Sequence, residues 1–257
     1  MKIKIFYDKS VEENAEIYFE KSKKIKKKIE SLKKKIQEFK ERLNKIKEKE
    51  KGNLIKIKKN KQWYHKFRWF FTSNNLLVVA GRDATSNEVL IKKYTEKNDL
   101  VLHTEIKGSP FTVIKSNNKE IDEKSIEEAA IFTASFSRAW KEGLAILEVF
   151  YVKPEQVSKK APSGEYLTKG SFMIYGKKNF IKVPLQLYCG IYKGFFMIGP
   201  KSAIEKHCEK YVKIIQGNKK ISDIAKKLKK ILNYDDLDEI IRNLPQGCDI
   251  DLKDSKL

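Results

Sequence analysis

Three side chains capable of acid–base chemistry recur at strand-like spacing in the segment Asp99-Leu100-Val101-Leu102-His103-Thr104-Glu105. Alternate residues of a β-strand point to the same face, so Asp99, His103 and Glu105 are expected to project together. A carboxylate beside an imidazole could act as general acid and base on a ribose 2′-hydroxyl, or bind a metal. The alternative is a polar strand face on which the carboxylates orient a histidine that contacts phosphate. The rest of the sequence offers no convincing second half of an active site, which favours this alternative.

A second segment combines small, flexible residues with lysines, over residues 156–170 and again at Gly176-Lys177-Lys178-Asn179. Exposed backbone N–H groups and adjacent lysines can surround a phosphate without reading a base. A plain basic surface loop explains the same composition. The aromatic and basic run from Trp63 to Phe71 is equally ambiguous, because its alternate rings could fill a core or stack on unpaired bases.

The elements that would position these residues form an α+β pattern. A hairpin is expected from residues 63–71 and 76–80, further strands over 100–106, 111–115, 144–151 and 171–175, and helices over 83–94 and 122–142. The sum predicts a mostly antiparallel sheet covered by one or two helices. A small α/β extension should follow, with a hairpin around Lys193-Gly194, a short helix from Ser202, a strand over 211–215 and a helix from Ser222.

The first fifty residues have a different periodicity. Apolar residues recur with alternating spacings of four and three from Val11 to Ile46, with Ser22 as the one lapse, and most residues between them are Lys or Glu. This is the pattern of a coiled coil, and a helix of that span would be about 54 Å long. Ser10 and Glu13 should form a capping box at its start, and Gly52-Asn53 should end it. The hydrophobic seam requires a partner helix, either in a second copy of the chain or in an upstream segment of a longer protein.

The amino-acid composition of the chain limits the classes of molecule that it could bind. The 257 residues carry 55 Lys+Arg and 34 Asp+Glu, a formal net charge of +21. A thermophile-style surface raises both signs of charge together, so a one-signed surplus favours a polyanionic partner, either nucleic acid or an anionic membrane face. The apolar runs are too short to cross a bilayer, and residues 1–6 lack the apolar core of a secretory signal. Cys189, Cys208 and Cys248 are widely spaced and are expected to be isolated thiols in the cytoplasm, with no disulfide, metal site or other cofactor.

Six ordered motifs, together with the 170–179 segment, identify a resemblance to the RNA-binding domain of the NFACT family of ribosome-associated quality-control proteins, which includes NEMF and RqcH. They are Trp63-Tyr64-x-Lys66-Phe67-Arg68-Trp69-Phe70, Gly81-Arg82-Asp83-Ala84-x-x-Asn87-Glu88, Asp99-x-x-x-His103, Ser137-x-Ala139-Trp140, Gln156-Val157-Ser158-Lys159 and Ala161-Pro162-Ser163-Gly164-Glu165-Tyr166-Leu167. The resemblance covers about residues 56–183. The N-terminal helix is similar to the second arm of the family's coiled-coil hairpin, through Asn14-Ala15-x-x-Tyr18-Phe19-x-Lys21.

The resemblance implies a non-enzymatic factor that binds tRNA and a large ribosomal subunit carrying a stalled nascent chain, and that supports C-terminal tailing of that chain. It implies three segments: a coiled-coil segment 1–52, an RNA-binding domain 53–183 and an extension 184–257. The family usually has a histidine where this chain has Lys107, which weakens catalytic schemes based on a histidine pair. The alternatives are an RNA-processing enzyme that uses Asp99, His103 and Glu105, and a coiled-coil assembly protein whose lysines only aid solubility.

The residues predicted to bind nucleic acid are basic, aromatic or small residues of these motifs and of the segments around them. They are Lys61, Trp63, Tyr64, Arg68, Arg82, Asp83, Lys92, Lys93, His103, Lys107, Lys159, Lys160, Ser163, Gly164, Lys169, Lys177 and Lys178.

Overall fold

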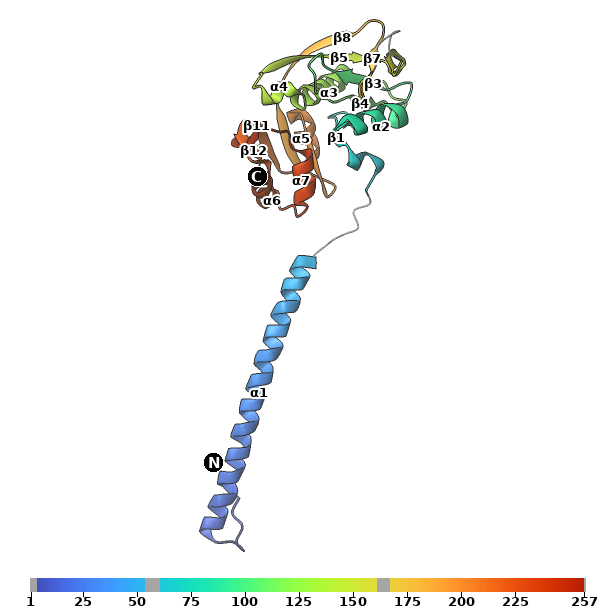
Figure 1. The fold of residues 1–257 in the computed structure, drawn as a ribbon. Coiled ribbons are helices and arrows are strands. Elements are labelled where there is room, and N and C mark those ends of the chain that lie inside the picture. The colour runs from blue at the N-terminus through green and yellow to red at the C-terminus, as the bar shows by residue number, and fades with distance from the viewer. Residues whose placement is uncertain (1–3, 54–60, 161–166, 257) are drawn as a thin grey trace. The chain divides into compact units, whose positions relative to one another are not determined.

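A computed structural model describes residues 4–53, 61–160 and 167–256 (Figure 1). The chain divides into two compact units, residues 1–58 and residues 59–257. The first is built around one long helix and the second is a body of antiparallel sheets and helices. The predicted α+β class is therefore confirmed.

Helix α1 (Val11–Asn53) begins where the sequence predicts. The Glu13 backbone N–H donates to Ser10 Oγ at 3.1 Å, and the Ser10 N–H donates to Glu13 Oε2 at 2.8 Å, which is the expected capping box. Asn14 lies 8% exposed and bonds both backbone groups of Phe6, while the Tyr18 hydroxyl donates to the Lys4 carbonyl. Two polar side chains thus fasten the segment that precedes the helix.

The apolar stripe of α1 is largely exposed at the positions whose side chains the structure describes. Its described members between Ile25 and Phe39 are 46–62% exposed. An uncovered seam of this kind is what a coiled-coil helix presents to a partner, so the partner helix stays a prediction.

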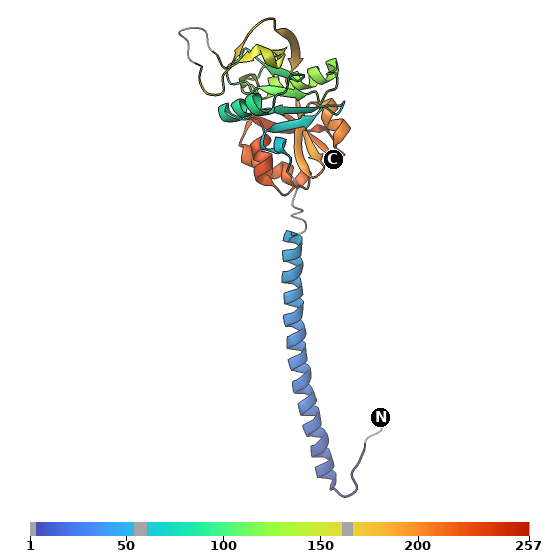
Figure 2. The ribbon, with the colours of Figure 1, turned by 90° about the vertical axis from the view of Figure 1, so that its right-hand side faces the viewer.

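The second unit contains a six-stranded sheet in which every neighbouring pair of strands is antiparallel (Figure 2). In spatial order its strands are β1 (Arg68–Phe71), β2 (Leu77–Ala80), β4 (Thr112–Lys115), β3 (Leu100–His103), β5 (Ile146–Val152) and β8 (Asn179–Pro184).

A four-stranded antiparallel sheet follows along the chain, and two further short strands form a ribbon. The four are β10 (Phe195–Gly199), β9 (Leu187–Tyr192), β11 (Tyr211–Lys219) and β12 (Cys248–Lys256); the ribbon is β6 (Val157–Ser158) with β7 (Met173–Ile174).

The helices pack against these sheets, with α3 against β3, β4, β5 and β8. They are η1 (Trp63–Lys66), α2 (Ala84–Tyr94), α3 (Glu123–Ser135), α4 (Arg138–Lys141), η2 (Pro154–Gln156), α5 (Lys201–His207), α6 (Ile221–Ile231) and α7 (Leu237–Asn243).

One continuous hydrophobic core runs through residues 67–248, and the three cysteines are buried free thiols. Residues 184–256 therefore pack in the same compact unit as the preceding residues. The division at residue 183 stays a prediction about sequence organisation.

Two expected elements are wrong in detail. The run from Trp63 to Phe71 begins with a 3-10 turn, closed by the Gln62 N–H donating to His65 Nδ1 at 2.7 Å, and becomes a strand at Arg68. The helix expected over 122–142 is interrupted after Ser135. Ser137 causes a new start, because its Oγ accepts from the Ala139 N–H at 3.2 Å and donates to the Ala134 carbonyl at 2.7 Å.

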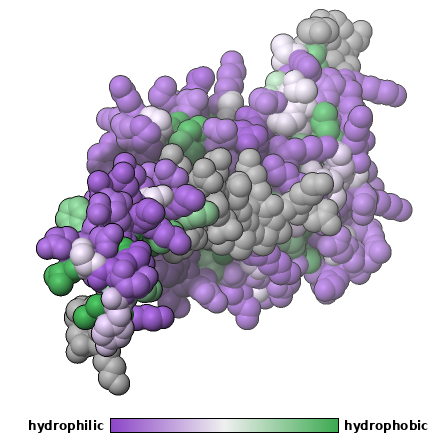
Figure 3. All heavy atoms as spheres, turned by 90° about the horizontal axis from the view of Figure 1, so that it is seen from below, coloured by the Kyte–Doolittle hydropathy of each residue, from purple (hydrophilic) through white to green (hydrophobic). Residues whose placement is uncertain are grey.

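Among the helices of the described residues, none has the length and apolar character needed to cross a bilayer. The face of the molecule in Figure 3 is mostly hydrophilic, with apolar side chains few and scattered.

Candidate nucleic-acid interface

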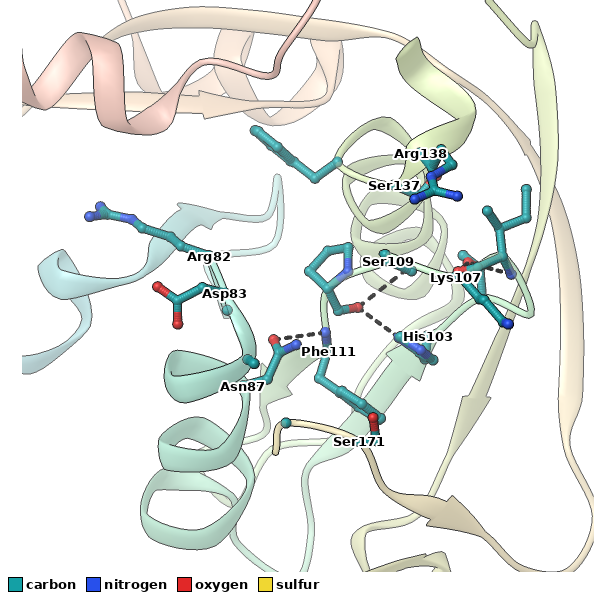
Figure 4. A pocket seen from close by; sticks show the side chains of 18 of the residues that line it. Arg82, Asp83, Asn87, His103, Lys107, Ser109, Phe111, Ser137, Arg138 and Ser171 are labelled. Carbon is teal, nitrogen blue, oxygen red and sulfur yellow. Dashed lines mark hydrogen bonds between the residues drawn. The ribbon is translucent and has the colours of Figure 1, made fainter. Parts of the chain in front are cut away.

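A cleft of about 980 Å³ lies at one end of the six-stranded sheet. The strand register explains this position. Arg68 pairs with Ala80, Ala80 with Thr112, and Leu102 with both Thr112 and Tyr151, so the start of β1 and β4 and the end of β2 and β3 meet at one end. The loops that leave this end carry the sequence motifs, which brings segments far apart in the chain to one site (Figure 4).

The lining of the cleft is strongly cationic. Seven basic side chains face it against two carboxylates, Asp83 and Glu105; the seven are Arg68, Arg82, Lys107, Arg138, Lys141, Lys169 and Lys178. Lys178 Nζ donates to Glu105 Oε1 at 2.6 Å. In the part of the chain that the structure describes, Lys107, Arg138, Lys141 and Lys169 are exposed and form no ion pair. Their charge is thus available to an anionic ligand.

The Gly81–Asn87 motif fixes the floor of the cleft. Asp83 caps α2 by accepting from the Ser86 N–H at 2.7 Å, and this hydrogen bond lowers the pKa of Asp83. Asn87 Oδ1 accepts from the Phe111 N–H at 3.2 Å. A Cβ on Gly81 would lie 1.9 Å from Asn87 Oδ1, so only glycine lets this asparagine reach the loop before β4.

Gly170 allows a second segment to approach the same helix. Its φ is +78°, and a Cβ there would lie 2.4 Å from the Ala84 Cα. The Gly170 N–H donates to Glu88 Oε2 at 3.2 Å. This contact places residues 168–174 along the cleft.

Arg68 and Arg82 are predicted site residues whose side chains are largely committed to the fold. Arg68 Nη1 donates to the Gly81 carbonyl at 3.2 Å, and its guanidinium lies 4.5 Å from the Phe136 ring centroid. Arg82 Nη2 donates to the Phe67 carbonyl at 2.8 Å and to Asn243 Oδ1 at 3.2 Å. Burial lowers the pKa of Arg68 to about 10 and lowers that of Arg82, yet both stay charged at neutral pH and add positive potential to the cleft.

His103 lies at the end of β3 and lines the cleft. Its Nδ1 is 2.9 Å from the Pro110 carbonyl oxygen, and its ring stacks on Phe111 with centroids 4.1 Å apart. Burial is the main cause that lowers the pKa of His103, so the ring is neutral at pH 7.

The predicted shared face of Asp99, His103 and Glu105 is wrong. Asp99 is 1% exposed and binds Lys115 Nζ at 2.6 Å and the Ser116 N–H at 3.0 Å, whereas the cleft is lined by His103 and Glu105. Asp99 precedes β3 and Glu105 follows it, so strand alternation does not extend over both positions.

The other predicted residues divide by position. Lys169 and Lys178 line the cleft with the residues named above. Trp63 stacks on Tyr94 at a centroid distance of 4.4 Å, and Tyr64 packs edge-on to Phe71, so both rings belong to an internal aromatic cluster. Residues outside the cleft lining, each with an exposed side chain, are Lys61, Lys92, Lys93, Lys160 and Lys177. Ser163 and Gly164 lie outside the described residues.

The ammonium group of Lys159 is engaged by other parts of the chain and is not free to bind a phosphate. Its Nζ donates to the carbonyls of Thr168 and Ser171 at 2.9 and 3.0 Å and lies 3.8 Å from Glu88. It therefore holds the segment that carries Lys169 to helix α2, which carries Glu88.

Sequence reasoning missed Arg138, Lys141 and Gln246 as cleft residues. Arg138 and Lys141 lie in α4, after the interruption that follows Ser135. The apolar periodicity over 122–142 predicted one continuous helix and gave no sign of this interruption. Gln246 comes from the turn after α7 and reaches the cleft through the fold of the C-terminal segment. The Ser137-x-Ala139-Trp140 motif was the available signal for the first two, because it brackets Arg138.

Comparisons with known proteins identify the family of this chain. Residues 66–176 match the model of the NFACT protein RNA-binding domain. The archaeal Rqc2 homolog aRqcH of Methanocaldococcus jannaschii is 45% identical over 203 residues, which is 76% of this chain and 30% of that protein. The ribosome quality control complex subunit NEMF of Homo sapiens is 36% identical over 67% of this chain and 15% of its own length. The Drosophila melanogaster NEMF homolog is 43% identical over 50% of this chain and 13% of its own length.

The present chain thus spans less than a third of the length of these relatives. The matched residues 66–176 contain most of the cleft lining, including Arg82, His103 and Arg138. On the matched domain and these relatives together, the chain belongs to the NFACT family.

Proposed function

We propose that this protein binds RNA through the sugar–phosphate backbone, in the cationic cleft at the end of the six-stranded sheet. The single observation that supports this is the cluster of seven basic side chains facing two carboxylates. Lysine and arginine neutralise phosphates and release the counterions condensed on them, which gives affinity without sequence preference. The exposed Arg138 and Lys141 beside half-buried Arg68 and Arg82 suit a backbone that follows the cleft.

The wider role we propose is that of a ribosome-associated quality-control factor. The relatives from Drosophila melanogaster and Homo sapiens are named as a homolog and a subunit of the ribosome quality control complex. The RNA partners would be tRNA and a large ribosomal subunit with a stalled nascent chain, in support of C-terminal tailing in the cytoplasm. The exposed stripe of α1 would pair with another helix, from a second copy or from another part of a longer protein.

An RNA-processing enzyme is less well supported, because both carboxylates that would act with His103 are engaged by lysines. Glu105 accepts from Lys178 Nζ at 2.6 Å. Asp99 lies in a buried ion pair with Lys115. We therefore propose that the protein positions RNA and that bond chemistry is performed elsewhere. Incubation with tRNA, with and without a divalent metal ion, tests this: intact RNA is expected, and cleavage that the His103→Asn substitution abolishes would contradict it.

The binding site is tested by removing two of its exposed cations. The double variant Arg138→Ala/Lys141→Ala should weaken RNA binding and reduce the slope of log affinity against log salt by about 2, since two phosphate contacts are lost. The matched control is Lys226→Ala/Lys227→Ala, which removes the same charge from exposed positions of α6 away from the cleft. Equal losses in both variants would indicate non-specific attraction to net charge and would contradict the cleft as the site.

The identity of the RNA is tested by capture. Protein bound in a cell lysate and recovered with its RNA should be enriched in tRNA and large-subunit rRNA relative to the double variant. Enrichment of messenger RNA alone would contradict the ribosome-associated role and leave the RNA-binding cleft in place.

A further inference from the structure

The hydrogen-bonding state of His103 is fixed by its surroundings. Its Nδ1 lies 2.9 Å from the Pro110 carbonyl oxygen, which can only accept a hydrogen bond. Nδ1 of the neutral ring therefore carries the hydrogen, and Nε2 keeps its lone pair. Stacking on Phe111 at an interplanar angle of 1°, and an edge contact with Phe150, hold the ring in this orientation.

Nε2 is an acceptor that the protein leaves unused. His103 lines the cleft, and within residues 4–53, 61–160 and 167–256 no donor bonds its Nε2. Figure 4 shows His103 beside the loop that carries Ser109 and Lys107, on the opposite side of Phe111 from Asn87. A lone-pair acceptor in a cleft of cations is a poor partner for phosphate, whose oxygens are also acceptors.

A cation lies on the same aromatic cluster. Lys178 Nζ is 4.5 Å from the centroid of the Phe150 ring, and the centroids of Phe150 and His103 are 6.0 Å apart. Lys178 Nζ also donates to Glu105 at 2.6 Å, but the Glu105 side chain is 67% exposed, so this ion pair is weak and a phosphate can replace the carboxylate. A ligand that suits both groups carries an anion and a hydrogen-bond donor a few ångströms apart. In a sugar–phosphate backbone the sole hydrogen-bond donor is the ribose 2′-hydroxyl, and DNA lacks it.

We propose that His103 Nε2 accepts a hydrogen bond from a ribose 2′-hydroxyl while Lys178 neutralises an adjacent phosphate, and that this pair makes the cleft prefer RNA to DNA. The proposal rests on the proposed function, since it concerns RNA held in the same cleft. It adds a specificity-determining residue to a site whose other contacts are sequence- and sugar-independent.

The test compares three single-stranded oligonucleotides of one sequence by fluorescence anisotropy: RNA, its 2′-fluoro analogue and DNA. The 2′-fluoro group keeps the RNA-like sugar pucker and removes the donor. The wild-type protein should bind RNA about fivefold more tightly than the 2′-fluoro oligonucleotide, the size expected for one net hydrogen bond.

Two variants separate the acceptor from the structural role of the ring. His103→Asn keeps a donor for the Pro110 carbonyl and removes the acceptor at the Nε2 position, so it should bind RNA and the 2′-fluoro oligonucleotide equally. His103→Gln extends its amide toward the Nε2 position and should restore part of the preference. Thermal melting of each variant reports whether the fold is kept.

Each contrary outcome has a distinct meaning. Equal wild-type affinity for RNA and the 2′-fluoro oligonucleotide would overturn this inference and leave the proposed function standing. An equal loss of both affinities in His103→Asn would assign the residue a structural role only and would also overturn it. A loss on replacing guanosine by inosine, with no effect of 2′-fluoro, would mean that Nε2 reads a base amine instead. Failure of the wild-type protein to bind any of the three would overturn the proposed function itself.

Discussion

The two ends of the six-stranded sheet differ in whether their basic side chains have carboxylate partners. At the end where β3 begins, Asp99 and Lys115 form an ion pair at 2.6 Å with side chains 0% and 5% exposed. At the end where β3 finishes, the exposed cations Arg138 and Lys141 have no carboxylate partner among the described residues. The first arrangement supports the fold and the second leaves charge for a ligand, so the pairing of charged residues indicates function here better than their number does.

The largest expected effect is a loss of stability on breaking the Asp99–Lys115 ion pair. Asp99→Asn leaves Lys115 buried with the Tyr94 carbonyl and an exposed Glu96 as its remaining partners, and should lower the free energy of unfolding by about 3–5 kcal/mol. Urea unfolding followed by circular dichroism measures this. The RNA affinity of the folded fraction should stay unchanged, and a stability loss below about 1 kcal/mol would mean that this pair does not hold the sheet end together.

The next effect concerns Gly170, whose contact with α2 positions residues 168–174 along the cleft. Gly170→Ala forces an L-residue into φ +78° and places its Cβ 2.4 Å from Ala84. Gly108→Ala is the matched control, since Gly108 has φ +83° and no atom lies within 4 Å of the place that its Cβ would take. The control should cost about 1–2 kcal/mol from backbone strain alone, and Gly170→Ala should cost more and weaken RNA binding. Equal costs in urea unfolding would show that the contact with α2 contributes nothing.

Local arrangements, which depend on residues close together in the chain, could be predicted from the sequence. The capping box of Ser10 and Glu13 and the hairpin at Lys193-Gly194, where both residues have positive φ, are local arrangements and are confirmed. The helix expected over 83–94 belongs to the same class, since α2 covers residues 84–94. Each depends on hydrogen bonds between residues at most a few positions apart.

What the sequence could not predict depends on segments brought together by the fold. Lys159 was expected to contact phosphate, but Thr168 and Ser171 reach its ammonium group only after β6 and β7 have paired. The strand β12 was not expected, because its residues Asp249 to Ser255 are mostly polar and gain a place in the sheet from pairing with β11. Arg138 enters the cleft because Ser137 restarts the helix.

A change of pH should alter the preference of the cleft for RNA over the 2′-fluoro oligonucleotide. Burial, opposed by the Pro110 hydrogen bond and by Glu105 and assisted by Lys178, lowers the folded pKa of His103 below its ordinary value of 6.5. As pH falls through the folded pKa, Nε2 gains a proton and changes from acceptor to donor, so the preference for RNA over the 2′-fluoro oligonucleotide should disappear while affinity for both rises. Below pH 6.5 the unfolded chain takes up this proton first, so His103 also makes stability fall with acidification.

Anisotropy titrations at about pH 7.5 and at successively lower pH measure this change in preference. His103→Asn is the control, and its ratio of affinities should not depend on pH. A wild-type preference that persists at pH values where the loss of stability due to His103 has already levelled off would mean that another group accepts the hydroxyl.

The smallest expected effect tests whether exposed lysines matter wherever they lie. Lys92 and Lys93 were predicted to bind nucleic acid, yet they lie at the end of α2 outside the cleft lining, and Lys92 Nζ already donates to Glu88 at 2.6 Å. Lys92→Ala/Lys93→Ala removes the same charge as Arg138→Ala/Lys141→Ala and should change RNA affinity by less than about twofold at physiological salt, because screening limits distant charges. A loss equal to that of the cleft variant would extend the RNA path along α2, and the contrast drawn between paired and unpaired charge would then no longer locate the site.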